Sequence, residues 1–164
     1  MKLYLVRHGI AEEAKDTKPD GQRALTAEGI EKFKQAAKGF VRMLDEAEKL
    51  GVILTSPLVR ARQTAEILAK ALAKEGKPAT VKAEASLDFP GDLNKAIDAA
   101  RAARGDVALV GHEPYLSEWI GRLCFLSVGS VEMKKGAIAV IELEEAGLRG
   151  TLLQLLPPRV LRKL

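Results

Sequence analysis

The two histidines of this chain each stand just after a short apolar run. His8 follows residues 3–6 after one arginine, and His112 follows residues 107–110 after one glycine. The carboxyl ends of parallel strands form the ligand crevice of an open α/β sheet, so the two imidazoles are expected to share one space if these strands are neighbours. An imidazole placed there can act as a nucleophile, as an acid or base, or as a hydrogen-bond donor.

Two arginines accompany the histidines. Arg7 directly precedes His8, and Arg60 lies in the first turn of a helix expected after a third apolar run at residues 52–54. A guanidinium presents a planar fork of donors to phosphate oxygens, and a helix N-terminus favours the same anion. The set therefore suits a phosphate dianion, and its positive charge disfavours protonation of the His8 imidazole.

The elements that must position these residues follow from hydrophobic spacing. Six strands are predicted, at residues 3–6, 52–54, 80–83, 107–110, 137–143 and 151–155. Helical spacing predicts four helices, at residues 30–44, 58–72, 92–104 and 114–123. Three of the helix starts carry capping signals: Thr26, Ser56 followed by Pro57, and Asp92.

The order of these elements predicts the fold class. Strands alternate with helices over the first two thirds of the chain, and the last two strands are joined as a hairpin through residues 144–149. We therefore expect an α/β fold, a three-layer α/β/α sandwich with a mixed, mostly parallel sheet. Residues 1–164 are expected to form a single domain. Residues 15–22, rich in charge with one proline and one glycine, are expected to form a loop.

Composition narrows the classes of partner. The net charge of +4 and the pI near 9.2 favour anionic ligands, but only 4% of residues are aromatic and the lysines and arginines are interleaved with acids. A solvated surface is expected rather than a nucleic-acid groove. The single cysteine, Cys124, cannot form an internal disulfide, and no apolar run has the length of a membrane span, so a cytoplasmic location without a membrane partner is expected.

Other cofactor chemistries lack a motif in this sequence. The chain has no cluster of His, Cys or Asp at metal-ligand spacing and no glycine-rich nucleotide loop, so neither a metal nor an organic cofactor is expected. A cysteine phosphatase would need an arginine six positions after its cysteine, and the residue there is Ser130. Cys124 is therefore not expected to be the nucleophile of such an enzyme.

Three segments resemble a known family in order and spacing. The segments LVRHG at residues 5–9, SPLVRARQTA at residues 56–65 and GHEP at residues 111–114 resemble the three motifs of the histidine phosphatase superfamily, also called phosphoglycerate mutase-like. Within it, RHGIA at residues 7–11 and DGQRALTAEG at residues 20–29 are similar to the SixA-type phosphohistidine phosphatases. The resemblance runs from residue 2 to about residue 143.

The resemblance implies a role for each matching residue. His8 would be the nucleophile, which attacks phosphorus in line and forms a phosphohistidine that water then hydrolyses. Arg7, Arg60 and His112 would hold the phosphoryl oxygens, and Gly9 is implied as a further substrate-binding position.

Two further site residues come from less specific segments. Arg23, in the segment before the first helix, matches the SixA-like stretch and is expected to contact the substrate. In relatives that cleave phosphomonoesters, a carboxylate after the third strand protonates the leaving oxygen, and Asp88 is the candidate for that acid here. Asp88 could instead simply cap a loop or helix, and Asp92 is interpreted as a plain N-cap.

The predicted function is a metal-independent phosphatase that hydrolyses phosphohistidine on a protein through a covalent intermediate on His8. One alternative is a small phosphomonoesterase that acts on a sugar, nucleotide or cofactor phosphate with Asp88 as general acid; phosphoglycerate mutase activity is less favoured because those relatives carry longer insertions. Another is a non-catalytic phosphate-binding module. The expected partner is a phosphorylated protein or a small phosphorylated substrate, and the chain is expected to be a monomer or a small homo-oligomer.

Overall fold

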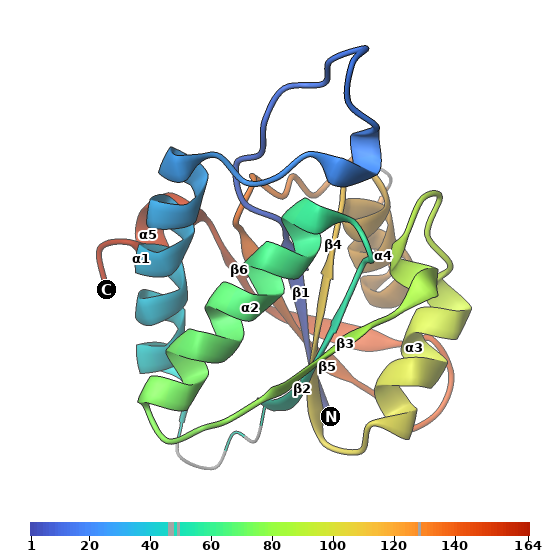
Figure 1. Ribbon diagram of the computed structural model, residues 1–164. Coiled ribbons are helices and arrows are strands. Elements are labelled where there is room, and N and C mark those ends of the chain that lie inside the picture. The colour runs from blue at the N-terminus through green and yellow to red at the C-terminus, as the bar shows by residue number, and fades with distance from the viewer. Residues whose placement is uncertain (46–47, 49, 128) are drawn as a thin grey trace.

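The computed structural model describes residues 1–45, 48, 50–127 and 129–164, and within them six strands form one sheet in the order β3-β2-β4-β1-β5-β6 (Figure 1). The strands are β1 (Lys2–Arg7), β2 (Leu50–Thr55), β3 (Thr80–Ala83), β4 (Asp106–Gly111), β5 (Ile138–Leu143) and β6 (Gly150–Leu156). The first four strands pair in parallel, whereas β5 pairs antiparallel to β1, and β6 antiparallel to β5. The predicted mixed, mostly parallel sheet and the terminal hairpin are confirmed.

Helices cover both faces of this sheet. They are α1 (Ala27–Met43), α2 (Val59–Lys74), α3 (Leu93–Ala102), α4 (Tyr115–Cys124) and α5 (Pro158–Leu161), with short 3-10 turns η1 (Asp20–Gln22) and η2 (Ala85–Leu87). Alternate residues of β1 point to opposite faces, so Leu3 and Leu5 pack with α3 and α4, whereas Tyr4 and Val6 pack with α1 and α2. The two cores on either side of the sheet confirm the three-layer α/β/α sandwich.

The predicted capping signals differ in their outcome. Thr26 Oγ1 accepts a hydrogen bond from Gly29 N at 2.9 Å, and Asp92 Oδ1 accepts one from Lys95 N at 3.2 Å, as N-caps do. The prediction that Ser56 caps the next helix is wrong, because α2 begins at Val59 after Leu58. Ser56 and the proline after it form the turn that leads from the end of β2 to α2, and this leaves the serine hydroxyl at the sheet edge.

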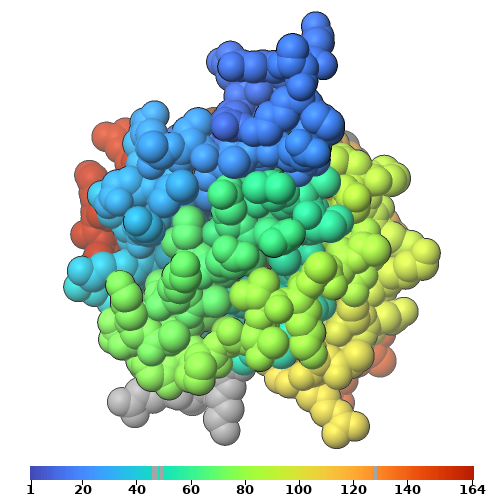
Figure 2. All heavy atoms as spheres, viewed as in Figure 1, coloured from blue at the N-terminus to red at the C-terminus, as the bar shows by residue number. Residues whose placement is uncertain are grey.

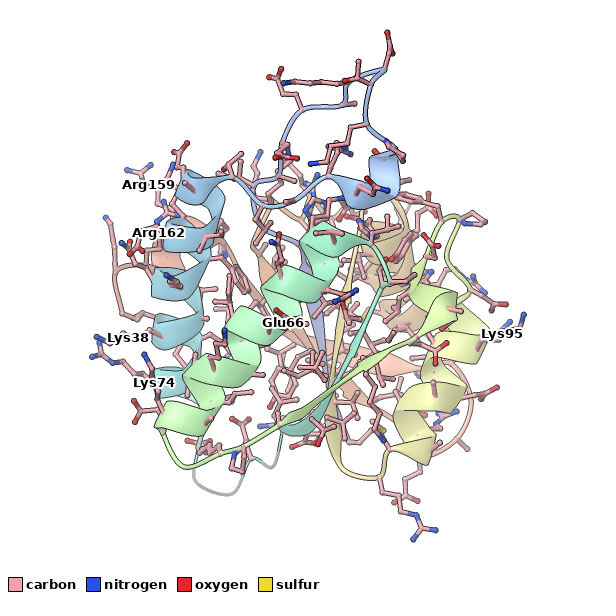
Figure 3. The ribbon with its side chains drawn as sticks, viewed as in Figure 1. Lys38, Glu66, Lys74, Lys95, Arg159 and Arg162 are labelled. Carbon is pink, nitrogen blue, oxygen red and sulfur yellow. The ribbon has the colours of Figure 1, made fainter. Side chains whose placement is uncertain are left out.

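Charged side chains lie on the outside of the helices. Lys38 on α1, Lys74 on α2 and Lys95 on α3 point away from the protein, and Glu66 lies on the same helix as Lys74 (Figure 3). This mixture fits the solvated surface expected from the interleaved charges. Across the described part of the chain, no helix combines the length and the apolar character that a bilayer crossing needs.

The segment between β1 and α1 stands out from the sandwich. Residues 12–20 rise as a protrusion above the ends of the parallel strands (Figure 2). It returns through η1, whose Asp20 contacts the first turn of α2. The protrusion therefore lies at the carboxyl-terminal edge of the parallel strands, where His8 and His112 are predicted to lie.

Candidate active site

Three neighbouring strands end at one edge of the sheet. Arg7 is in register with Gly111, His8 N donates to Gly111 O at 3.1 Å, and Ser56 N donates to Val110 O at 2.9 Å. These bonds bring the ends of β1, β4 and β2 side by side. As a result, the ring centroids of His8 and His112 lie 5.0 Å apart. The expectation that both imidazoles share one space is confirmed.

Gly111, the last residue of β4, leaves room for the Tyr115 side chain. A Cβ atom at this position would lie 2.4 Å from Tyr115 Oη, a distance that no real contact shows. The Tyr115 hydroxyl is held in place because it donates to Leu87 O. Only glycine therefore permits this tyrosine to pack behind His112.

The His8 side chain is held as one neutral tautomer. Its Nδ1 lies 2.7 Å from Gly9 O, and because a carbonyl oxygen only accepts, the proton is on Nδ1 and Nε2 keeps its lone pair. The residue is 7% exposed. Burial lowers the pKa of His8 to about 4, and the charges of Arg60 and Arg7 add to this effect although the Gly9 hydrogen bond opposes it. His8 is therefore neutral at pH 7, with a nucleophilic Nε2.

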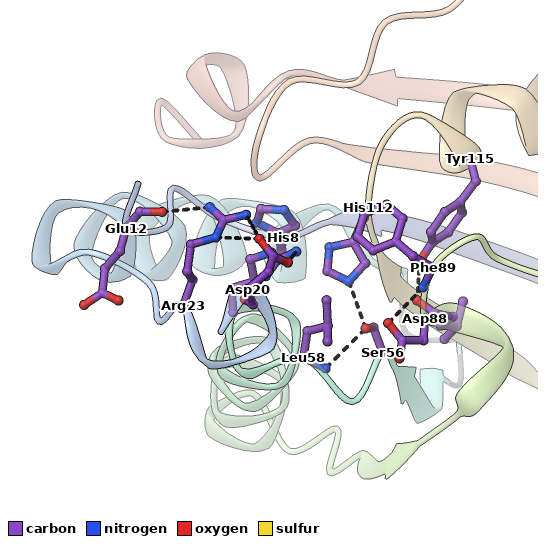
Figure 4. A network of polar contacts seen from close by, with 12 residues as sticks. His8, Glu12, Asp20, Arg23, Ser56, Leu58, Asp88, Phe89, His112 and Tyr115 are labelled. Atoms are coloured by element: carbon purple, nitrogen blue, oxygen red, sulfur yellow. Dashed lines mark hydrogen bonds and ion pairs between the residues drawn. The ribbon is translucent and has the colours of Figure 1, made fainter. Parts of the chain in front are cut away.

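His112 is buried more completely, at 1% exposure, and pairs with the serine that was misassigned as a cap. Its Nε2 lies 2.8 Å from Ser56 Oγ. With the proton on Nδ1, Nε2 accepts from the serine hydroxyl, whose oxygen accepts from Leu58 N at 3.3 Å (Figure 4). Burial, His8 and Arg60 lower the pKa of His112 to about 3. Ser56 thus fixes the ring, a role that the sequence analysis missed.

The two arginines are anchored to different segments of the protein. Arg60 is only 2% exposed, and its Nη1 and Nη2 donate to Asp20 O at 2.9 Å and Asp20 Oδ2 at 3.0 Å. Arg7 is half-buried and its Nη1 donates to Met133 O at 2.6 Å; burial lowers the pKa of its guanidinium. Arg7 Nε, Arg60 Nε and His112 Nδ1 are buried without a hydrogen-bond partner in the described part of the chain. An oxyanion is the kind of ligand that supplies acceptors to such groups.

Asp20 links two guanidinium groups and was also missed in the sequence. Its Oδ1 accepts from Arg23 Nε at 2.8 Å while Oδ2 accepts from Arg60, and Arg23 Nη1 donates to Glu12 O at 2.8 Å (Figure 4). Burial raises the pKa of Asp20, but the hydrogen bonds from both arginines outweigh it and the net shift is downward. Arg23 therefore reaches the site through Asp20, and its contact with substrate stays a prediction.

Gly9, just after β1, is hydrogen-bonded to the N-terminal half of α2. Its N–H donates to Thr64 Oγ1 at 3.1 Å, and that hydroxyl donates to Arg60 O at 2.7 Å. Both backbone polar groups of Gly9 are thus used within the protein, one to orient His8 and one to bind Thr64. This arrangement favours a positioning role for Gly9, whose predicted role in substrate binding stays untested.

Asp88 lies at the rim of the site, directly after η2. Its Oδ1 accepts a hydrogen bond from Phe89 N at 2.8 Å, and the Phe89 ring lies 4.9 Å from the ring of His112. Asp88 is half-buried, and its neighbour Phe89 places it close to His112.

No three side chains of His, Cys, Asp or Glu in the described residues form a group that could hold a metal ion.

The comparisons with known proteins agree with this geometry. Residues 3–88 match the family described as the histidine phosphatase superfamily (branch 1). The chain belongs to the histidine phosphatase superfamily. An uncharacterized protein of Picosynechococcus sp. is 38% identical over 144 residues, which cover 84% of this chain and 82% of that protein. The family predicted from the three motifs is confirmed, and with it the enzyme class of a phosphatase.

Solved structures share the fold of this histidine phosphatase. The protein histidine phosphatase SixA, complexed with tungstate, matches with a TM-score of 0.79 and 23% identity over 97% of this chain and 98% of its own. A phosphoglycerate mutase from Bacillus anthracis matches with a TM-score of 0.71 and 15% identity over 99% and 95%. An alpha-ribazole phosphatase from Shigella flexneri matches with a TM-score of 0.67 and 18% identity over 96% and 97%. The phosphoglycerate mutase-like architecture is confirmed.

The lowered pKa values of the two histidines predict a dependence of stability on pH. Unfolded histidine titrates near pH 6.5, whereas His8 and His112 titrate near 4 and 3 in the fold, so between these values the unfolded chain binds more protons. Their contribution is complete above about pH 6.5 and is lost as the pH falls toward 4, by a few kcal/mol, roughly. The urea midpoints at pH 7.5 and 4.5 measure this loss. The double variant His8→Asn/His112→Asn is expected to show a smaller difference between the two midpoints. An unchanged difference in that variant would assign the effect to carboxylates.

Proposed function

We propose that this protein is a metal-independent phosphatase that hydrolyses phosphohistidine on a protein through a covalent intermediate on His8. The observation that carries the proposal is the pairing of a neutral His8, whose Nδ1–H donates to Gly9 O, with the buried guanidinium of Arg60 nearby. The complex of SixA with tungstate, a tetrahedral oxyanion like phosphate, supports a phosphoryl group as the ligand of this fold.

The first chemical step is an in-line transfer. The Nε2 lone pair of His8 forms a bond to phosphorus while the P–N bond of the substrate breaks. The substrate ring carries a proton on its other nitrogen, so the electron pair of that bond leaves it as a neutral imidazole. The negative charge on the three equatorial oxygens is met by Arg7, Arg60 and His112. These donors are fixed before the substrate arrives, because each is anchored to the protein by a hydrogen bond of its own.

The second step returns the enzyme to its starting state. Water attacks the phosphorus of phosphorylated His8, the Nε2–P bond breaks, and inorganic phosphate leaves as the lone pair returns to Nε2. The hydrogen bond from Nδ1 to Gly9 O persists throughout, so the ring needs no change of tautomer between the steps. Gly9 therefore acts on both halves of the reaction by holding one imidazole nitrogen.

The leaving group explains why phosphohistidine is favoured over an ester. An alkoxide leaves as a strong base, near the pKa of about 16 of water, whereas the imidazole of histidine has a conjugate acid with a pKa of about 6.5. A phosphorylated imidazole therefore needs little help from a general acid. Asp88 Oδ1 accepts from its own neighbour Phe89, an arrangement that suits a loop carboxylate as well as an acid.

A specific observation also supports the phosphomonoesterase alternative: Asp88 directly precedes Phe89, which packs on His112, and the alpha-ribazole phosphatase shares the fold. Asp88→Asn separates the two functions. The variant is expected to keep cleavage of an N-phosphohistidine peptide within about twofold, while hydrolysis of an alkyl phosphate falls about 100-fold. Phosphate release from both substrates in the presence of a chelator measures this.

Asp98→Asn, an exposed carboxylate on α3, is the matched control and is expected to leave both rates unchanged. Faster wild-type turnover of the alkyl phosphate than of the peptide would select the phosphomonoesterase. Binding of phosphate without turnover of either substrate would select the phosphate-binding module. A protein substrate, a cytoplasmic location and a monomer or small homo-oligomer remain part of the proposal.

A further inference from the structure

One aromatic ring lies exposed at the rim of the site. The chain has four phenylalanines, two tyrosines and one tryptophan, and all but two are buried in the cores. The two exposed rings are Phe89, which is 49% exposed, and Phe125 at the far end of α4 from His112. A single exposed phenylalanine is ordinary on a protein surface. The position of Phe89 against a buried site histidine is what distinguishes it.

Phe89 is held as a fixed platform. Its ring packs 4.9 Å from His112 with a tilt of 31°, and the edge of Tyr115 meets it at 6.0 Å. Tyr115 is itself fixed by its hydroxyl contact with Leu87 and by the ring of Trp119 at 4.7 Å. The backbone N–H of Phe89 donates to Asp88. One side of the Phe89 ring is thus held against His112 and Tyr115, and the rest of the ring is exposed to solvent.

The order of the three rings relates Phe89 to the nucleophile. His8, His112 and Phe89 follow one another at 5.0 Å and 4.9 Å, with His112 in the middle (Figure 4). In an in-line transfer, the leaving group lies on the side of phosphorus opposite the nucleophile. A phosphoryl group bound at the arginines and attacked by His8 therefore directs its leaving group away from His8, and Phe89 is the exposed ring that packs on His112 at the rim.

We propose that the exposed face of Phe89 is a leaving-group subsite that stacks a planar aromatic ring attached to the phosphoryl group. The inference rests on the proposed function for the identity of that ring, which is then the imidazole of a phosphohistidine. Aromatic pairs gain from offset or edge-to-face contact beyond the area they bury. The subsite thus selects phosphohistidine over phosphoramidates and esters with flexible alkyl leaving groups.

Two peptides of one sequence, with N-phosphohistidine or N-phospholysine at the same position, test the subsite. Both contain a P–N bond, but only the first has a ring. Phe89→Ala is expected to lower kcat/KM for the phosphohistidine peptide about three- to tenfold and to leave the phospholysine peptide within twofold. Phe89→Trp is expected to keep the wild-type ratio, and Phe89→Leu to behave as the alanine variant. Phe125→Ala is the matched control, with no change expected on either peptide.

An equal loss on both peptides would overturn the proposal, since Phe89 would then act by supporting His112. No loss on either peptide would overturn it as well. A second pair, phenyl phosphate and cyclohexyl phosphate, separates this inference from the proposed function. If the wild type cleaves only esters, the phosphohistidine assignment fails, yet a selective loss on phenyl phosphate in Phe89→Ala would still establish the subsite. The same loss on both esters would reject it.

Discussion

Replacement of His8 by alanine is expected to reduce phosphate release from an N-phosphohistidine peptide by roughly 10⁴-fold or more. The variant loses the nitrogen that bonds to phosphorus, and no other residue described here offers a neutral imidazole with a free lone pair in that position. In the wild type, rapid quench during turnover is expected to trap a phosphorylated protein, and peptide mapping to place the phosphoryl group on His8. Phosphate release and the mass of the quenched protein measure the two effects.

The binding of inorganic phosphate is the control for this variant. Arg7 and Arg60 are anchored to Met133 and Asp20 rather than to His8, so His8→Ala is expected to bind phosphate within several fold of the wild type. Calorimetry with phosphate and the urea midpoint show whether the site has stayed intact. A wild-type rate of turnover in His8→Ala would overturn the covalent mechanism. Loss of phosphate binding together with turnover would point to a disturbed site instead.

The elements that carry the chemistry could be predicted from local patterns. The strands before the two histidines, β1 and β4, contain uninterrupted apolar runs, because their residues are buried on both faces of the sheet, and such runs can be recognised in sequence. The shared space of the two histidines was predicted on the condition that these strands are neighbours, and β1 and β4 do pair in parallel. Spacing and resemblance were therefore enough to predict four site residues: Arg7, His8, Arg60 and His112.

Contacts that depend on tertiary structure could not be predicted in the same way. Ser56 followed by proline matches an N-cap signal, and only the 2.8 Å contact with His112 shows where its hydroxyl is used. Asp20 lies in a charged loop segment of no regular period, and its partner Arg60 is 40 residues away along the chain. Phe89 is an ordinary loop phenylalanine until the packing on His112 is known.

Arg60→Ala is the variant with the second largest expected effect, a fall in kcat/KM of about 100- to 1000-fold on the phosphohistidine peptide. The guanidinium is buried and fixed, so its charge acts on the phosphoryl oxygens with little screening by water. Arg60→Lys keeps the charge but loses the planar fork, and is expected to retain at most a tenth of the activity. Steady-state kinetics on the same peptide measure both variants.

Two further variants separate charge stabilisation from loop anchoring. Arg62→Ala removes an exposed arginine from the same helix and is expected to leave kcat/KM within twofold. Asp20→Ala removes the carboxylate contact with Arg60 but keeps the backbone contact through residue 20 O and leaves the guanidinium in the site, so it is expected to keep activity within about tenfold. Equal losses in Asp20→Ala and Arg60→Ala would show that Arg60 serves to hold the loop. A loss confined to Arg60→Ala and Arg60→Lys would place its guanidinium on the phosphoryl group during transfer.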